Sequence, residues 1–196
     1  MPKQLVSMLS RIVDHFGYKV SRNKTVVDSD DPYEIISRII DPKTVKVIID
    51  AGASIGNTTV KLSNLFPKSK VYAFEPYPPF VKQLNERANK NNNIKVVPFA
   101  LGHENGQRFF NVNQSEGTNS LLKSGDKARE IYGSLIDQKE LIEINAKTLY
   151  SWFCENNISK IDILKLDLQG GELDALKGAN KLFEFGKVKS ILCEVM

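Results

Sequence analysis

Cysteine, tryptophan and long apolar runs are scarce in this sequence. The 196 residues include two cysteines, Cys154 and Cys193, and one tryptophan. The cysteines lack the spacing of a metal site, so we expect reduced thiols in or near the core of a cytoplasmic protein, with no metal bound. Polar residues interrupt the N-terminal apolar positions, and no run of about 18 apolar residues occurs. The sequence therefore predicts neither a signal peptide nor a membrane span.

Charge of one sign is also not concentrated anywhere. Lysine and arginine number 27 against 23 aspartates and glutamates, which gives a net charge of +4. The basic residues are dispersed rather than gathered into a block, so nucleic acid is not an expected partner. Hydrophobic residues make up 41% and charged residues 26% of the chain, which is typical of a globular protein with one core.

The N-terminal part has a helical pattern. Apolar residues recur with a helical period over Lys3–Phe16 and stop at Gly17. A second helix is expected to begin near Asp31-Pro32, with the proline in its first turn. We interpret residues 1–44 as a helical extension that precedes one domain over 45–196. The first helix could pack on its own domain or make peripheral contact with a membrane surface.

Beyond Pro42, apolar strands alternate with amphipathic helices. The expected strands are Val45–Asp50, Lys70–Phe74, Ile94–Ala100, Arg108–Val112, Glu140–Asn145, Ile161–Leu168 and Val188–Val195. The expected helices are Asn57–Phe66, Pro79–Lys90, Thr148–Asn156 and Glu172–Phe185. This alternation predicts a doubly wound α/β fold, with a parallel sheet covered by helices on both faces. The segment Asn111–Gly125 is expected to be a polar loop near the carboxyl edge of the sheet.

The first strand ends on a carboxylate, Asp50, and a glycine-bearing turn follows it. A dinucleotide fingerprint starting at Gly52 would need glycines at Ser54 and Asn57, and no Gly-Lys-Ser/Thr phosphate loop occurs. The pattern D-x-G-x-S-x-G suits S-adenosylmethionine, which has no phosphate but carries an ammonium and a carboxylate. We expect Asp50 to bind the ammonium, directly or through water, and the turn amides to bind the carboxylate. The expected cofactor residues of this segment are Asp50, Gly52, Ala53, Ser54, Gly56, Asn57 and Thr58.

Two further strand ends are expected at the same edge of the sheet. Glu75 follows the second strand, where an acidic residue can accept hydrogen bonds from both ribose hydroxyls, and Pro76 comes next. Ala100 and Leu101 follow the third strand and are expected beside the adenine. His103, a lone histidine in a polar loop, is expected at the surface.

Together these segments resemble one known family. The stretches DAGASIGNTT, FEPYPPFVKQLNERANKNN, VVPFALGHENG, GTNSLL, IDILKLDLQGGELDALKGA and ILCEV are similar, in this order, to FkbM-type S-adenosylmethionine-dependent methyltransferases. The resemblance implies a Rossmann-like class I methyltransferase sheet of order 3-2-1-4-5, with strands 6 and 7 apparently missing. It also implies methyl transfer to a hydroxyl of a sugar, glycan or small natural product. Three positions depart from the family pattern: Ser54, Tyr150 and Gln169, of which the last replaces a glutamate.

The fourth core strand carries the candidate catalytic residues. Methyl transfer needs the acceptor held in line and one proton removed from the hydroxyl. We expect Asp167, at the end of this strand, to act as base or orienter, with Lys165 on the same strand face and Glu172 at the start of the next helix. Glu172 could instead serve only as a favourable helix start. In the polar loop, Asn119 and Ser120 are expected to donate hydrogen bonds to the acceptor.

Two other readings stay open at this point. The glutamine at position 169 and the short C-terminal part are compatible with a catalytically impaired module that binds S-adenosylmethionine or acts as a scaffold. An RNA methyltransferase would fit the positive charge, but the N-P-P-Y type of motif that favours base methylation is absent. The oligomeric state is not predicted.

Overall fold

The structure is a computed structural model, and it describes residues 31–123 and 125–194. The predicted helix Lys3–Phe16 lies outside these residues. The chain divides into two units after Ile35, and the second unit, from Ile36, contains all the strands described below. Helix α2 (Pro32–Ile39) confirms the helix predicted at Asp31-Pro32. The Asp31 carboxylate accepts a hydrogen bond from the Tyr33 amide at 3.0 Å, as an N-terminal cap does.

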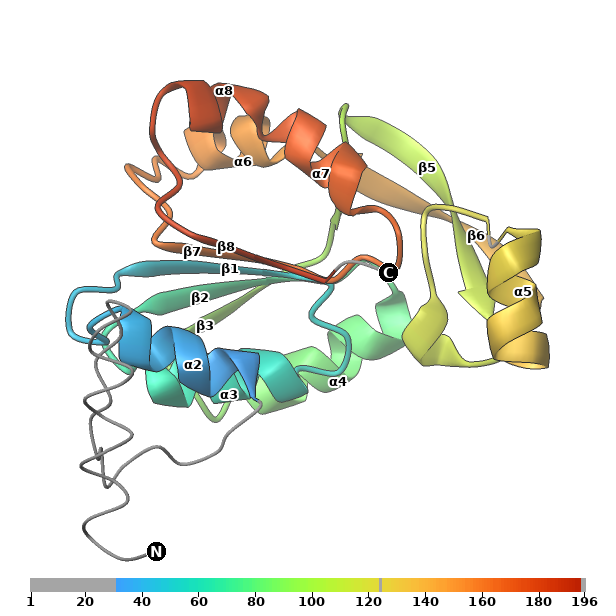
Figure 1. The fold of residues 1–196 in the computed structure, drawn as a ribbon, viewed down its shortest axis with the longest axis horizontal. Helices are drawn as coiled ribbons and strands as arrows, with labels where there is room; N and C mark the ends of the chain where they lie inside the picture. Colours follow the sequence, from blue (N-terminus) through green and yellow to red (C-terminus); the bar gives the residue numbers. More distant parts are fainter. Residues whose placement is uncertain (1–30, 124, 195–196) are drawn as a thin grey trace, which may run out of the picture. The chain divides into compact units, whose positions relative to one another are not determined.

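A five-stranded parallel sheet forms the centre of the second unit (Figure 1). Its strands are β1 (Val47–Ala51), β2 (Lys70–Phe74), β3 (Ile94–Val97), β7 (Ile163–Leu166) and β8 (Ile191–Cys193). The order β3-β2-β1-β7-β8 confirms the predicted order 3-2-1-4-5. The direction in which strands are added reverses between β1 and β7, and the carboxyl ends of these strands flank the crevice where α/β sheets bind ligands.

Helices cover both faces of this sheet (Figure 1). One face carries α3 (Asn57–Leu65) and α4 (Pro78–Ala88), and the other carries α6 (Leu149–Glu155), α7 (Glu172–Gly178) and α8 (Asn180–Glu184). The prediction of a single helix over Glu172–Phe185 is wrong in one respect, because the segment forms two helices, α7 and α8, with an interruption at Ala179.

The side chains of β2 alternate between the two faces of the sheet and pack in both layers of the core. Tyr72 and Phe74 point to one face and contact Trp152 of α6 edge-to-face, with ring centroids 4.8 Å and 4.9 Å away. Ala73 points to the other face and packs with Leu84 of α4. Successive side chains of a strand point in opposite directions, so one apolar strand supplies both layers of the core.

A second sheet of three strands lies beside the central one. It contains β4 (Ala100–Leu101), β5 (Gly106–Asn113) and β6 (Gln138–Lys147), in the order β4-β6-β5. The strand predicted over Ile94–Ala100 is divided between the two sheets, because Pro98 has no amide hydrogen to continue the ladder. Strands β5 and β6 pair antiparallel with each other rather than with the central sheet.

The segment between β5 and β6 is more regular than predicted. It holds a short 3-10 helix η1 (Glu116–Thr118), the helix α5 (Asp126–Tyr132) and a second 3-10 helix η2 (Gly133–Ile136). Good helix formers between Gly125 and Gly133 were the available sequence signal for α5. The polar loop at 111–125 is thus partly helical and partly an extension of β5.

Two further sequence predictions concern the cysteines and the absence of a membrane span. Both cysteines are free; Cys193 is partly buried, but Cys154 is exposed on α6 and not near the core as expected. Within residues 31–123 and 125–194, no helix is long and apolar enough to cross a membrane.

Helix α7 approaches β4 so closely that only glycine fits at Gly178. A Cβ there would lie 2.0 Å from the Gly102 carbonyl oxygen. Replacing glycine by alanine in a helix ordinarily stabilises by roughly 0.5–1 kcal/mol. We expect the reverse here, a loss of about 1–3 kcal/mol in the free energy of unfolding for Gly178→Ala, measured by urea denaturation. Gly117→Ala, inside η1, where a Cβ meets nothing within 4 Å, is the matched control and should change stability by less than about 0.5 kcal/mol. Equal midpoints for the two variants would contradict the close packing.

Candidate active site

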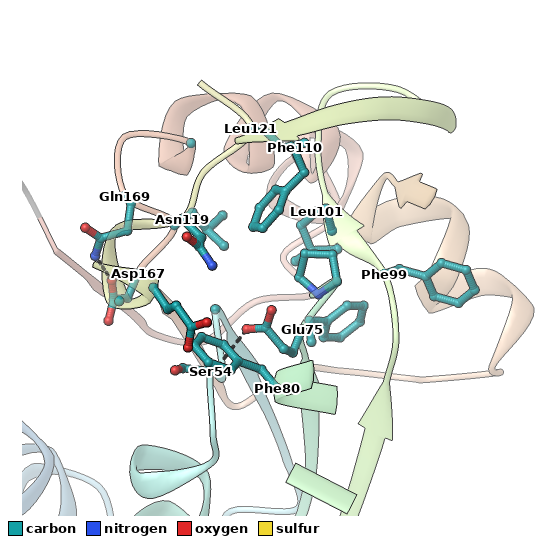
Figure 2. Close-up of a pocket in the computed structure, with 18 residues that line it drawn as sticks. Ser54, Glu75, Phe80, Phe99, Leu101, Phe110, Asn119, Leu121, Asp167 and Gln169 are labelled. Atoms are coloured by element: carbon teal, nitrogen blue, oxygen red, sulfur yellow. Dashed lines mark hydrogen bonds between the residues drawn. The ribbon is translucent and has the colours of Figure 1, made fainter. Parts of the chain in front are cut away.

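A pocket opens at the carboxyl edge of the central sheet (Figure 2). One side is formed by the ends of β1, β2 and β7, which contribute Gly52, Glu75 and Asp167. The other side comes from the second sheet and its loop, with Phe110 and Asn119. The pocket therefore lies at the strand-order reversal where the sequence predicted a ligand.

The turn after β1 is built tightly against the end of β7. Gly52 has φ +74°, and a Cβ at this position would lie 1.8 Å from the Asp167 carbonyl oxygen. Gly56, with φ +92°, begins α3, and its Cβ would meet Leu84 at 2.6 Å. Both positions need glycine for the backbone conformation and for the space. These two glycines fix the path of the turn between β1 and α3, and Gly52 lines the pocket.

Glu75 is a buried carboxylate that faces the pocket. Its Oε2 accepts a hydrogen bond from the Ser54 amide at 2.8 Å, and its Oε1 accepts one from the Tyr77 amide at 2.9 Å. Burial raises the pKa of Glu75 to about 7, against the lowering effect of these two amides. The carboxylate is held rigidly, and it titrates close to neutral pH.

Asp50 forms a buried ion pair below the pocket. Its Oδ1 lies 3.0 Å from the Lys165 ammonium, and its Oδ2 accepts a hydrogen bond from the Thr59 hydroxyl at 2.6 Å. Both charged side chains are at most 3% exposed. Lys165 also donates to the carbonyl oxygens of Ala51 and Gly52, at 3.2 Å and 3.0 Å. The ammonium that meets Asp50 in this structure is thus supplied by the protein.

Asp167 is the partly exposed carboxylate of this charged group. Its side chain is 32% exposed, and its Oδ2 lies 3.5 Å from the Lys165 ammonium. Its Oδ1 accepts a hydrogen bond from the Gln169 side-chain amide at 2.8 Å. Glu194, at the end of β8, lies beside it, and a hydrogen bond with Asp167 and the charge of that residue raise the pKa of Glu194. Sequence analysis missed Glu194, although ILCEV belonged to the family segments.

Glu172 turns away from the pocket toward its own backbone. Its Oε1 accepts a hydrogen bond from the Leu168 amide at 2.6 Å. The turn that it closes contains Gln169 with φ +53° and Gly170 with φ +93°. Glu172 therefore stabilises the turn between Asp167 and α7, much as a capping residue at a helix start does.

The predicted residues fall into two groups. Those that line the pocket are Gly52, Ser54, Glu75, Pro76, Ala100, Leu101 and Asp167. Those that do not line it are Asp50, Ala53, Gly56, Asn57, Thr58, Lys165 and Glu172, and the Asn57 side chain is held by Arg87. His103 is 47% exposed and contacts Glu104 and Asp174 outside the pocket.

Much of the second wall was not predicted from the sequence. Phe80, Phe110, Glu116 and Leu121 line the pocket. Phe80 and Leu121 lie in the family segments FEPYPPFVKQLNERANKNN and GTNSLL, which were the available signal for them. In the part of the chain that the structure describes, no group of three or more histidine, cysteine, aspartate or glutamate side chains is placed to hold a metal ion.

The Asp50–Lys165 pair leads to a stability prediction. Lys165→Met would leave the Asp50 charge buried without its partner, so the free energy of unfolding should fall by roughly 3–5 kcal/mol. The double variant Asp50→Asn, Lys165→Met should recover a large part of this loss, because it buries no charge. Urea denaturation of the single and double variants measures the coupling. Additive losses would contradict a direct interaction.

Several known proteins similar to this chain are named as methyltransferases. The profile of the methyltransferase FkbM domain matches residues 50–196. Methyltransferase 1 of Beauveria bassiana is 26% identical over 142 residues, which are 67% of this chain and 57% of that protein. The 2-O-methyltransferase NoeI of Sinorhizobium fredii is 23% identical over 153 residues, 76% of this chain and 62% of that protein. The matched part of the chain thus spans about three fifths of these two relatives.

One solved structure supports the fold. The methyltransferase FkbM of Methylobacillus flagellatus KT superimposes with a TM-score of 0.52 at 17% sequence identity. The superposition covers 82% of this chain and 36% of that one. The match over three quarters of the sequence and the doubly wound sheet agree: this chain belongs to the FkbM methyltransferase domain family.

Proposed function

We propose that this protein binds S-adenosylmethionine and transfers its methyl group to a hydroxyl of a sugar, a glycan or a small natural product. The observation that carries the proposal is the pair of carboxylates, Glu75 and Asp167, that reach one pocket from the ends of β2 and β7. Membership of a methyltransferase family supports methyl transfer. The relative named as a 2-O-methyltransferase supports an oxygen as the acceptor atom.

The residues at the edge of the sheet fit this cofactor. Glu75 would accept hydrogen bonds from the ribose hydroxyls, with Pro76, Ala100 and Leu101 beside the base. The Gly52 turn lets the backbone approach the methionine part closely, and Ser54 of the same turn lines the pocket. When bound, S-adenosylmethionine supplies an electrophilic methyl group on a sulfonium.

Asp167 would receive the proton of the acceptor hydroxyl. Its Oδ1 is oriented by Gln169 and its Oδ2 lies near Lys165, so the carboxylate is fixed and its negative charge is stabilised. A positioned carboxylate of this kind contributes roughly 10²–10⁴-fold as a general base. Holding the hydroxyl oxygen in line with the methyl carbon would supply the remaining rate enhancement.

The other predicted residues take positioning roles in this proposal. Both oxygens of Asp50 are engaged by Thr59 and Lys165, so Asp50 would hold Lys165, and Lys165 would fix the carbonyls of Ala51 and Gly52. Glu172 would hold the turn that follows Asp167. A cytoplasmic location and a small-molecule or glycan acceptor belong to the same proposal.

The impaired-module reading depends on Gln169. A glutamate at this position would put a second negative charge beside Asp167, whereas the glutamine side chain donates a hydrogen bond to it at 2.8 Å. The glutamine therefore contacts Asp167 without adding a charge, and it does not by itself remove the proposed base. Turnover decides between a working enzyme and a binding module.

Cofactor binding is tested by calorimetric titration with S-adenosylhomocysteine. We expect one-to-one binding that Glu75→Ala weakens about tenfold to a hundredfold, because hydrogen bonds to a charged acceptor are lost. Glu86→Ala, an exposed glutamate on α4 outside the pocket, should bind like the wild type. Wild-type affinity in Glu75→Ala would remove Glu75 from the site.

The raised pKa of Glu75 also predicts how binding depends on pH. With a pKa of about 7, Glu75 is mostly protonated at pH 6 in the free protein, and ribose hydroxyls would favour its ionised form. Binding at pH 6 should therefore release roughly one proton, and affinity should rise about fivefold from pH 6 to pH 7. Titrations in buffers of different ionisation enthalpy measure the released proton, which should be absent in Glu75→Ala.

Catalysis is tested by turnover on a panel of sugars, glycans and hydroxylated metabolites. Asp167→Asn should bind S-adenosylhomocysteine within about threefold of the wild type but lose roughly 10²–10⁴-fold in turnover, because an amide cannot accept the proton. Formation of S-adenosylhomocysteine measures turnover, with Asp174→Asn on α7 as the control outside the pocket. Full activity of Asp167→Asn on any acceptor would contradict its role as base.

A further inference from the structure

We propose that the side-chain amide of Asn119 donates a hydrogen bond to a ring nitrogen of the adenine base bound in this pocket. The inference rests on the proposed function, because the base belongs to S-adenosylmethionine. It adds a recognition residue on the loop between β5 and β6, outside the strand ends that define the cofactor site.

The orientation of the Asn119 amide is fixed by its neighbour. Its Oδ1 accepts a hydrogen bond from the Asn113 backbone amide at 2.8 Å. A backbone N–H is always a donor, so the oxygen of Asn119 must face Asn113 and the Nδ2 group must face the opposite way. Figure 2 shows this Nδ2 group pointing into the pocket.

The Nδ2 group of Asn119 is a buried donor that has no hydrogen-bond partner among the described residues. Buried polar groups in folded proteins are nearly always paired, and one left unpaired is costly. Because this donor lies at the wall of a pocket, a ligand in that pocket is the natural source of its partner.

The loop that carries Asn119 is already ordered. Asn113 donates its side-chain amide to the Thr118 carbonyl at 2.7 Å, and Asn111 and Ser120 exchange backbone hydrogen bonds at 2.8 Å and 3.2 Å. The Ser120 hydroxyl donates to the Gln169 carbonyl at 2.9 Å, which ties the loop to the turn after β7. A donor held in this way loses little freedom when it binds, so its hydrogen bond contributes to affinity.

The surroundings of the Nδ2 group favour the base over the other parts of the cofactor. Leu101, Phe110 and Leu121 are apolar residues of the same pocket, and the flat purine is less polar than the ribose or the charged methionine part of S-adenosylmethionine. Glu75 faces the same space, so a ribose bound there would place the attached base within reach. The ring nitrogens of adenine are hydrogen-bond acceptors, which an amide donor matches.

Two variants of Asn119 distinguish the loss of the hydrogen-bond donor from a disturbance of the loop. Asn119→Asp keeps an oxygen for the Asn113 amide but has no donor at the other position, and Asn119→Ala removes both. By calorimetry, we expect Asn119→Asp to weaken S-adenosylhomocysteine binding tenfold or more and Asn119→Ala about 3- to 15-fold. Asn85→Asp, at an exposed site on α4, controls for the added charge, and thermal melting confirms that each variant is folded.

Analogues of S-adenosylhomocysteine identify which ring nitrogen of the base accepts the hydrogen bond from Asn119. In three analogues, carbon replaces one ring nitrogen of the purine in turn, at N1, N3 or N7. For one of them, the wild type and Asn119→Ala should bind with equal affinity, because the hydrogen bond no longer exists in either complex. The other two analogues should retain the full difference.

Two results would overturn the inference while leaving the proposed function intact. One is wild-type affinity for S-adenosylhomocysteine in Asn119→Asp, and the other is an equal loss for all three analogues in Asn119→Ala, which assigns the donor to another part of the cofactor. A folded wild-type chain that binds no S-adenosylhomocysteine would overturn the proposed function itself.

Discussion

The buried ion pair between Asp50 and Lys165 is the interaction on which the site depends. The two residues are opposite each other in the register of β1 and β7, the strands between which the sheet order reverses. Burying two charges is costly unless each is paired and further hydrogen-bonded, and here Thr59 and two carbonyl oxygens complete the pairing. Lys165 thereby connects the end of β1, the Gly52 turn and Asp167 in one rigid group.

This arrangement separates a buried, paired charge from the carboxylates that face the pocket. Asp50 is neutralised inside the protein, while Asp167, at 3.5 Å from the same ammonium, keeps one side open to the pocket. Glu75 is balanced differently, since burial and two backbone amides act on its pKa in opposite directions. A carboxylate poised near neutrality in a pocket is typical of a functional site, because a ligand can stabilise its ionised form.

The pocket is shared between two sheets with different tasks. The central sheet supplies carboxylates and close backbone turns at its carboxyl edge, as α/β folds do. The second sheet supplies an apolar wall, in which Phe110 and Ala146 pack with Phe80 of α4. The Ser120 hydroxyl joins the two parts through the Gln169 carbonyl, so the loop of the second sheet is fixed relative to the turn that holds Asp167.

The sequence by itself determined the doubly wound α/β class and the strand-end residues Gly52, Glu75 and Asp167, because the period of strands and helices and the positions of strand ends are local patterns. The strand order of the central sheet was predicted from the resemblance to the FkbM family and not from these local patterns. Only the tertiary structure decided that Lys165 meets Asp50. It likewise decided that the predicted strands over 108–112 and 140–145 form their own sheet and supply the apolar wall. These features depend on which distant side chains meet after the chain has folded, and neither periodicity nor motif spacing contains that information.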